Sequence, residues 1–344
     1  MPDSSAPTTS NLVYFGSRIA SAAISRLLTA PFRWRSWNGA PVVYKDQEPK
    51  PLHLKENDTI AHWIGEEDAD IVILFLHGGG YTQPCSHGHM QYFHRLVTDI
   101  NNLPDSTLSI TVLLLAYTLA PEAQFPTQLK QATTLLSYLL KEGSRPASSI
   151  LIAGDSAGGG LSLSLLSHLL HPHPDIRTLN LNAPLRGVFL YSPWVSFDTS
   201  QDSYARNAQK DSLVPNVPRK WAGMYLGTGE GEVDPGITMG GDSYSEPLLG
   251  NASWWEGMHE VIRDVWIFGG KDEVFIDSMY AFQAKFCMGW VAGGGVEERV
   301  VVGFVEAEAH IGPVMDVLLQ YKKKSVTQLR FEEWLKGCLA EEST

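Results

Sequence analysis

The sequence predicts an α/β fold in which a mostly parallel sheet carries helices on both of its faces. The first observation is a set of short, continuous apolar runs, the pattern of strands buried on both faces, at 71–76, 110–115, 150–153, 188–191 and 265–268. The second is that helical patterns alternate with these runs, as in chains that build parallel sheets. The third is size: 344 residues, of which 44% are hydrophobic and 19% charged, can bury a large core.

The other elements follow from local patterns along the chain. Alternating stretches between residues 41 and 64, such as 59–64, predict edge strands near the start of the sheet. The histidines of 171–174 are expected on a solvated turn after a helix. The expected helices cover 89–100, 126–140, 159–170, a stretch ending near Met288 and one final stretch ending near Lys336, and the last strand is expected at 296–304.

The pattern predicts one domain, 11–344, preceded by a disordered tail at 1–10. Residues 13–32 have an amphipathic helical pattern, and we favour packing over the domain rather than binding to a membrane surface. A second region, at about 195–260, breaks the strand–helix rhythm and contains many aromatic residues. We therefore expect helical cap elements at about 11–40 and 195–260.

Residues 150–161, ILIAGDSAGGGL, form the stretch around which the chain is organised. The pattern is a buried strand, a sharp turn and a helix, with Ser156 at the turn. Gly154 and Gly158 stand two residues before and after Ser156 and leave room for the strained backbone that exposes a nucleophilic hydroxyl. This pattern predicts a nucleophile elbow. The alternative is an ordinary loop in which Ser156 caps the helix.

A run of three glycines follows the strand at 71–76, in the sequence HGGGY at 77–81. Glycine has no Cβ, so the backbone N–H groups of such a run can turn towards a ligand. Stabilising a tetrahedral oxyanion requires fixed donors of this kind. Together with the elbow, the run predicts an oxyanion hole.

A serine nucleophile needs a base, and the base needs an acid that orients it. His310 follows the last predicted strand and is the only histidine after His259. Asp272 and Glu273 follow an earlier strand. The order serine, acid, histidine is the order found in hydrolases built on such sheets. Ser156 is therefore the candidate nucleophile and His310 the candidate base, with the acid open between Asp272 and Glu273.

Three motifs together resemble the hormone-sensitive-lipase-like family of α/β-hydrolases: HGGG at 77–80, YTLAPEAQFP at 117–126 and GDSAGG at 154–159. The resemblance extends from about residue 60 to the C-terminus. The sequence looks most like fungal members of the family, some of which are encoded in secondary-metabolite gene clusters. It implies an α/β-hydrolase fold, a helical cap and esterase activity on small or medium acyl groups. It also implies an oxyanion hole made by the amides of Gly78, Gly79 and Ala157.

Two positions depart from the family pattern. Thr118 stands where the family usually has arginine, so one structural ion pair is expected to be absent. The family also has an Asp-x-x-x-Asp pattern after the strand, which fits Asp272 when counted from the preceding glycines and Glu273 when counted back from Asp277. We favour Glu273, because a gap in this short loop is a larger change than Glu in place of Asp. Asp272 remains the alternative.

The resulting hypothesis is a serine carboxylic ester hydrolase that acts on a small-molecule ester through a triad and an acyl-enzyme, without a metal or organic cofactor. One alternative is a biosynthetic hydrolase, or an acyl-transferring or cyclising enzyme with a dedicated intermediate. Another is a small-molecule receptor on a catalytically dead hydrolase fold. The presence of His310 argues against the receptor.

Composition argues against several other classes. The net charge of −12, with no basic stripe, argues against a nucleic-acid partner. Cys85, Cys287 and Cys338 form no disulfide framework, and 1–10 lacks a signal-peptide pattern, so a cytoplasmic protein is expected. No stretch approaches the roughly 20 apolar residues that a membrane span needs. The histidines at 87–94 lack the ligand spacing of a metal site.

Overall fold

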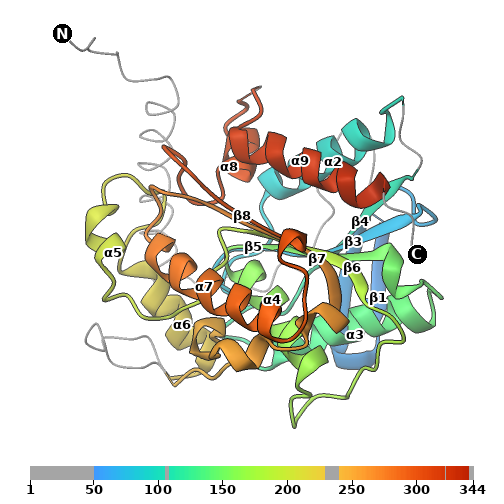
Figure 1. The fold of residues 1–344 in the computed structure, drawn as a ribbon, viewed down its shortest axis with the longest axis horizontal. Coiled ribbons are helices and arrows are strands. Elements are labelled where there is room, and N and C mark those ends of the chain that lie inside the picture. The colour runs from blue at the N-terminus through green and yellow to red at the C-terminus, as the bar shows by residue number, and fades with distance from the viewer. Residues whose placement is uncertain (1–49, 105–107, 229–239, 322, 341–344) are drawn as a thin grey trace.

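The fold is that of a computed structural model, which describes residues 50–104, 108–228, 240–321 and 323–340. A single sheet runs through the middle of the molecule, in the strand order β1-β2-β4-β3-β5-β6-β7-β8 (Figure 1). Its strands are β1 (Lys50–Leu54), β2 (Thr59–Ile64), β3 (Ile71–Leu76), β4 (Ile110–Leu115), β5 (Ile150–Asp155), β6 (Leu185–Tyr191), β7 (Ile262–Gly270) and β8 (Val300–Val305).

The sheet is mostly parallel, as predicted. From β4 to β8 every neighbouring pair is parallel, and only β2 runs antiparallel to both of its neighbours. The prediction of an edge strand at 59–64 is wrong, because β2 lies between β1 and β4 and the edge is β1. Residues 61–64 pair with 112–115 of β4, and this pairing buries that end of β2.

Helices cover both faces of the sheet, which confirms the predicted fold class. In Figure 1, α3 (Thr127–Lys141), α4 (Ala157–Leu170) and α7 (Ile276–Ala292) lie on one face, and α2 (His87–Asn101), α8 (Gly312–Leu318) and α9 (Val326–Ala340) lie on the other. Successive side chains of a strand point to opposite faces. In β3, accordingly, Val72, Leu74 and Leu76 join the first core, while Ile71, Ile73 and Phe75 join the second. Burial on both faces explains the unbroken apolar runs.

The end of the chain differs from its prediction. The prediction of a single final helix is wrong, because two helices, α8 and α9, follow β8. Gln320 has a left-handed φ of 60°, and the amide of Tyr321 donates to the carbonyl of Asp316, so the chain turns away after α8. The last strand begins at Val300 rather than Val296, since a short 3-10 turn, η6 (Glu297–Arg299), precedes it.

The segment between β6 and β7 contains short helices. They are α5 (Asp202–Arg206), α6 (Val217–Leu226), η3 (Pro247–Leu249), η4 (Ala252–Trp255) and η5 (Met258–Glu260). Its residues Tyr225 and Trp255 are fully buried in the first core. The other expected cap element, at 11–40, and the tail at 1–10 lie outside the described residues. Within the described ranges, no helix is both long and apolar enough to cross a bilayer.

The turn after α4 is more buried than predicted. His171 donates through Nε2 to the carbonyl of Trp254 at 2.8 Å. His173 is buried and packs edge-on against Tyr244 and Phe125. The expectation of a solvated turn is therefore wrong for His173, because the segment between β6 and β7 folds back over it.

Candidate active site

Ser156 lies at the turn between β5 and α4, at the carboxyl edge of the sheet. Its backbone has φ 52° and ψ −122°, a strained combination for a residue with a side chain. A Cβ on Gly154 would overlap the carbonyl of Gly158, and a Cβ on Gly158 would overlap that of Leu76. Both glycines are therefore required for α4 to begin this close to the sheet.

The side chain of Ser156 makes no capping hydrogen bond to α4, so an N-cap serine is the wrong interpretation. Its Oγ lies 2.8 Å from His310 Nε2, and His310 Nδ1 lies 2.8 Å from Glu273 Oε2. The three side chains follow β5, β8 and β7, and the carboxyl ends of parallel strands meet at one edge of the sheet. All three residues are buried, with exposed fractions of 4%, 3% and 0% for Ser156, His310 and Glu273.

The two candidate acids have different surroundings. Glu273 Oε2 meets His310, and its Oε1 accepts hydrogen bonds from the Ser192 hydroxyl at 2.6 Å and from a backbone amide of its own loop. Asp272 is turned towards the surface, where Oδ1 lies 3.2 Å from Lys210 Nζ. The structure therefore brings Glu273, and not Asp272, to the histidine.

The hydrogen bonds of His310 define its tautomer. The carboxylate of Glu273 only accepts, so Nδ1 carries the proton and Nε2 is free to accept the proton of Ser156. Burial by itself would lower the pKa of His310, but the hydrogen bond to Glu273 and the negative charges of Glu273, Asp211 and Asp155 raise this pKa above its ordinary 6.5. The carboxylate therefore both orients the imidazole and favours its protonated form.

The amide of Gly78 is already engaged. It donates to Asp155 Oδ1 at 2.8 Å, a contact that fixes the glycine run against the elbow strand. The expected role of this amide as an oxyanion donor is therefore wrong in this structure, because a donor that is held by a buried carboxylate is not available to a substrate.

The next two glycines have left-handed backbones, with φ 109° for Gly79 and 59° for Gly80. Within the described part of the chain, the amides of Gly79, Gly80 and Ala157 have no hydrogen-bond partner. The ring of Trp221, from α6, covers Gly80 so closely that a Cβ there would overlap it. The two remaining predicted donors, Gly79 and Ala157, are thus unengaged, and Gly80 joins them.

Asp155 and His89 form a buried ion pair behind the elbow, which sequence reasoning missed. His89 Nε2 lies 3.1 Å from both carboxylate oxygens of Asp155, and His89 Nδ1 lies 2.7 Å from Ser86 Oγ. Burial alone would lower the pKa of His89, but the charge of Asp155 raises it to about 10. His89 thus holds the carboxylate of Asp155 in place, and this carboxylate accepts the hydrogen bond of the Gly78 amide. The only sequence signal was the acid within GDSAGG.

Replacing His89 by alanine is expected to lower the free energy of unfolding by about 3–5 kcal/mol, since it leaves the buried carboxylate of Asp155 without its charged partner. Urea denaturation measures this loss. His87→Ala is the matched control, because His87 begins the same helix and is exposed. Equal losses in the two variants would show that the ion pair is not stabilising.

The contribution of this ion pair to stability also has a defined pH dependence. Because the pKa of His89 is raised from 6.5 to about 10, the contribution of its charge is complete below about pH 6.5 and is lost as the pH rises through about 10, while the lowered pKa of Asp155 keeps the carboxylate ionised over this range. The difference between wild type and His89→Ala should therefore shrink in alkaline solution.

Ser192 was also missed as a site residue. Its hydroxyl donates to Glu273 Oε1 and accepts from the amide of Ile311 at 3.2 Å, so it links the acid loop to the loop of the base. Its signal is its position: it directly follows β6, which lies between β5 and β7 in the sheet.

Thr118 is held without an ion pair. Its backbone amide donates to Gln131 Oε1 at 2.8 Å, Gln131 Nε2 donates to its hydroxyl at 2.9 Å, and Gln128 Nε2 donates to its carbonyl. Two glutamines of α3 thus support the turn that carries this residue.

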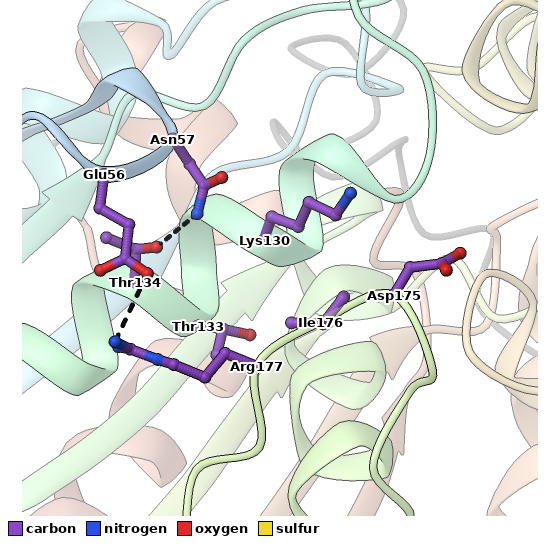
Figure 2. A pocket seen from close by; sticks show the side chains of 8 residues that line it. All are labelled: Glu56, Asn57, Lys130, Thr133, Thr134, Asp175, Ile176 and Arg177. Atoms are coloured by element: carbon purple, nitrogen blue, oxygen red, sulfur yellow. Dashed lines mark hydrogen bonds and ion pairs between the residues drawn. The ribbon is translucent and has the colours of Figure 1, made fainter.

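A separate polar pocket of about 240 Å³ lies where the 3-10 turn η1 (Glu56–Asp58), α3 and the loop after α4 meet (Figure 2). Arg177 faces Glu56 across it at 3.6 Å, and Asn57 donates to Thr134 at 2.8 Å. Among the described residues, its lining includes neither a serine nor a histidine, so the pocket contains no pair of nucleophile and imidazole like that of Ser156 and His310. The relay at Ser156 is therefore the candidate active site.

The fold and this site define a class of protein, a hydrolase-type α/β fold with a serine elbow. A model of the alpha/beta hydrolase fold family matches residues 73–305, and the chain belongs to that family.

Several relatives agree with this assignment. The chain is 27% identical over 268 residues to LipR of Mycobacterium tuberculosis, provisionally named an acetyl-hydrolase, covering 76% of this chain and 71% of LipR. It is 29% identical over 170 residues to an acetyl-hydrolase of Streptomyces hygroscopicus, covering 48% of this chain and 50% of that protein. The chain thus spans only half the length of the second relative.

Among solved structures, the chain resembles an esterase from the bacterial hormone-sensitive lipase family. The TM-score is 0.64 at 22% identity, with 94% of this chain and 99% of that one covered. The resemblance to hormone-sensitive-lipase-like α/β-hydrolases that the motifs predicted is confirmed at the level of the fold. The similarity to fungal members stays a prediction.

Proposed function

We propose that this chain is a serine hydrolase that cleaves small-molecule carboxylic esters with small or medium acyl groups. The observation that carries the proposal is the continuous relay Ser156–His310–Glu273, with 2.8 Å at each step. The names of the relatives, acetyl-hydrolase and esterase, support the same class of substrate.

In the proposed reaction, Ser156 Oγ gives its proton to His310 Nε2 and attacks the ester carbonyl carbon. Glu273 stabilises the resulting imidazolium through Nδ1. The tetrahedral intermediate then collapses, and the leaving alcohol takes the proton from His310. Water, deprotonated by the same imidazole, cleaves the acyl-enzyme and restores the hydroxyl of Ser156. No metal or organic cofactor is needed to balance these steps.

The proposed oxyanion donors are the amides of Gly79, Gly80 and Ala157. No described residue accepts a hydrogen bond from these amides, and Ala157 is the first residue of α4, where the positive end of the helix dipole favours negative charge. The ring of Trp221 stands against Gly80 and limits the space beside these donors. This restriction of space supports the proposal that the acyl group is short.

Hydrolysis of p-nitrophenyl acetate, butyrate and octanoate by the purified protein tests the proposal. We expect turnover of the acetate or the butyrate with a kcat/KM about tenfold or more above that of the octanoate. A fluorophosphonate, which labels activated serines, is expected to label Ser156. Labelling without turnover of any ester would contradict simple ester hydrolysis and favour a dedicated biosynthetic intermediate. Absence of both would contradict a serine hydrolase.

The pH dependence follows from the environment of the base. Only neutral His310 can accept the proton of Ser156, so kcat/KM should fall about tenfold per pH unit below the pKa of the free enzyme. Because the surrounding carboxylates raise this pKa, the acidic limb is expected above pH 6.5. A profile of kcat/KM against pH measures it. A limb below pH 6.5 would contradict this prediction and show that the effect of burial on His310 outweighs that of the carboxylates.

We also infer a cytoplasmic location. The support is that Cys85, Cys287 and Cys338 are all free thiols, as expected in a reducing compartment. Recovery of the protein from a cell fraction other than the cytosol would contradict this inference.

A further inference from the structure

Asp211 lies beside the relay without belonging to it. It stands in the turn after α5, within the segment between β6 and β7, and only 1% of it is exposed. Its Oδ1 accepts a hydrogen bond from the backbone amide of His310 at 3.1 Å, and its Oδ2 accepts one from the amide of Val274 at 2.7 Å. One carboxylate thus joins the loop of the base to the loop of the acid.

A neutral residue in the same turn supports only the acid loop. Asn207 Nδ2 donates to the carbonyls of Lys271 and Glu273 at 2.9 and 2.7 Å. The amide of Asp211 in turn donates to the carbonyl of Asn207. The turn therefore contacts the backbone on both sides of the Glu273 side chain, through an amide at one end and a carboxylate at the other.

The charge of Asp211 lies close to the reacting groups. Burial and the like charge of Glu273 raise its pKa to about 6, while His310 and the two amide donors oppose this rise. Tyr204 of α5 also faces it. His310 in turn faces Glu273 after β7, Asp211 in this segment and Asp155 of β5. Burying two negative carboxylates near one neutral imidazole is unfavourable in free energy, because the charges repel each other and lose their hydration. A positive imidazolium offsets this repulsion.

We propose that Asp211 is a positioning residue for the ester hydrolysis proposed above. Its carboxylate holds the acid and base loops in register and stabilises the imidazolium that forms when the proton of Ser156 moves to His310 Nε2. When that proton passes to the leaving alcohol, the stabilisation ends. This proposal rests on the proposed function, and it assigns a role in the reaction to the segment between β6 and β7.

Asp211→Asn is the main test. The variant keeps the shape but loses the charge, and its NH₂ group would oppose one of the two amide donors. We expect kcat to fall about tenfold or more while KM changes little, because the effect acts through the base. We also expect the acidic limb of kcat/KM to move down by about half a pH unit or more, since the imidazolium loses a nearby negative charge.

Two control variants separate charge from structure. Asn207→Ala loosens the acid loop without changing charge, so it should lower kcat and leave the acidic limb in place. Asp277→Asn removes a carboxylate that accepts hydrogen bonds from the Ser203 amide and from the Arg206 side chain of α5 and has no contact with the relay, so kcat and the acidic limb should both stay unchanged. The proposal would be overturned if Asp211→Asn left the acidic limb of kcat/KM unmoved and lowered kcat no more than Asn207→Ala does.

Asp211→Glu covers the case in which Asp211→Asn does not fold, which thermal unfolding would reveal. It keeps the charge and displaces the oxygens, so kcat should fall while the limb stays within about a quarter of a unit of wild type. A limb that moves down in Asp211→Glu would contradict the proposed role of the charge.

The rate at which a fluorophosphonate labels Ser156 is measured over the same pH range. Labelling requires the base but no ester turnover. If the wild type labels but hydrolyses no ester, the proposed function fails while the labelling profile of Asp211→Asn still tests this residue. A labelling limb that Asp211→Asn does not move would then overturn the role of Asp211 alone.

Discussion

Replacing Ser156 by alanine is expected to reduce the kcat for p-nitrophenyl acetate and butyrate by about 10⁴-fold or more. The hydroxyl is the atom that attacks, and its Oγ is the only group of the elbow within hydrogen-bonding distance of His310 Nε2 among the described residues. Without it, the oxyanion donors and the base remain but no acyl-enzyme can form. The residual catalysis should be that of the oxyanion donors and of substrate binding.

The matched control is Ser164→Ala. Ser164 is buried on α4, the helix that follows Ser156, and within the described part of the chain its hydroxyl has no hydrogen-bond partner. Its loss should therefore change neither folding nor kcat by more than about twofold. Thermal unfolding of both variants checks that the fold is kept. Turnover in Ser156→Ala comparable to that of Ser164→Ala would mean that Ser156 is not the nucleophile.

Neutralising Glu273 is expected to have the second largest effect. Glu273→Gln should lower kcat by about 10²–10⁴-fold, because the amide can present its NH₂ group to Nδ1, favour the wrong tautomer of His310 and no longer stabilise the imidazolium. The acidic limb of kcat/KM should also move to lower pH, since the hydrogen bond and charge that raise the pKa of His310 are gone.

Asp272→Asn is the matched comparison one residue away. Asp272 pairs with Lys210 at the surface, and surface ion pairs contribute little, so kcat should stay within about threefold of wild type. A larger loss in Asp272→Asn than in Glu273→Gln would reverse the assignment of the acid. If kcat fell by less than about tenfold in both variants, neither carboxylate would be the acid of the relay.

Much of this architecture could be predicted because its signals are local. Strands buried on both faces must be apolar throughout, so runs such as 71–76 and 110–115 matched their strands residue for residue. The elbow is equally local, since the glycines around Ser156 are required by backbone overlaps within a few residues and with the adjacent strand. Where local signals were ambiguous, the predictions failed in part: 59–64 is a strand but does not lie at the edge of the sheet, and the final helix is divided into two.

The sequence by itself determined the α/β class, the order of the strands' apolar runs, the serine elbow and the presence of a histidine and acids after later strands. Only the tertiary structure decided which acid meets the histidine, because Asp272 and Glu273 are neighbours in the chain and the turn after β7 sends their side chains in opposite directions. It also decided that Asp155 engages the amide of Gly78, and that a turn about 100 residues away in the chain from His310 supplies Asp211. These contacts depend on how loops from different strands meet at one edge of the sheet, and no pattern within a single stretch of sequence encodes that meeting.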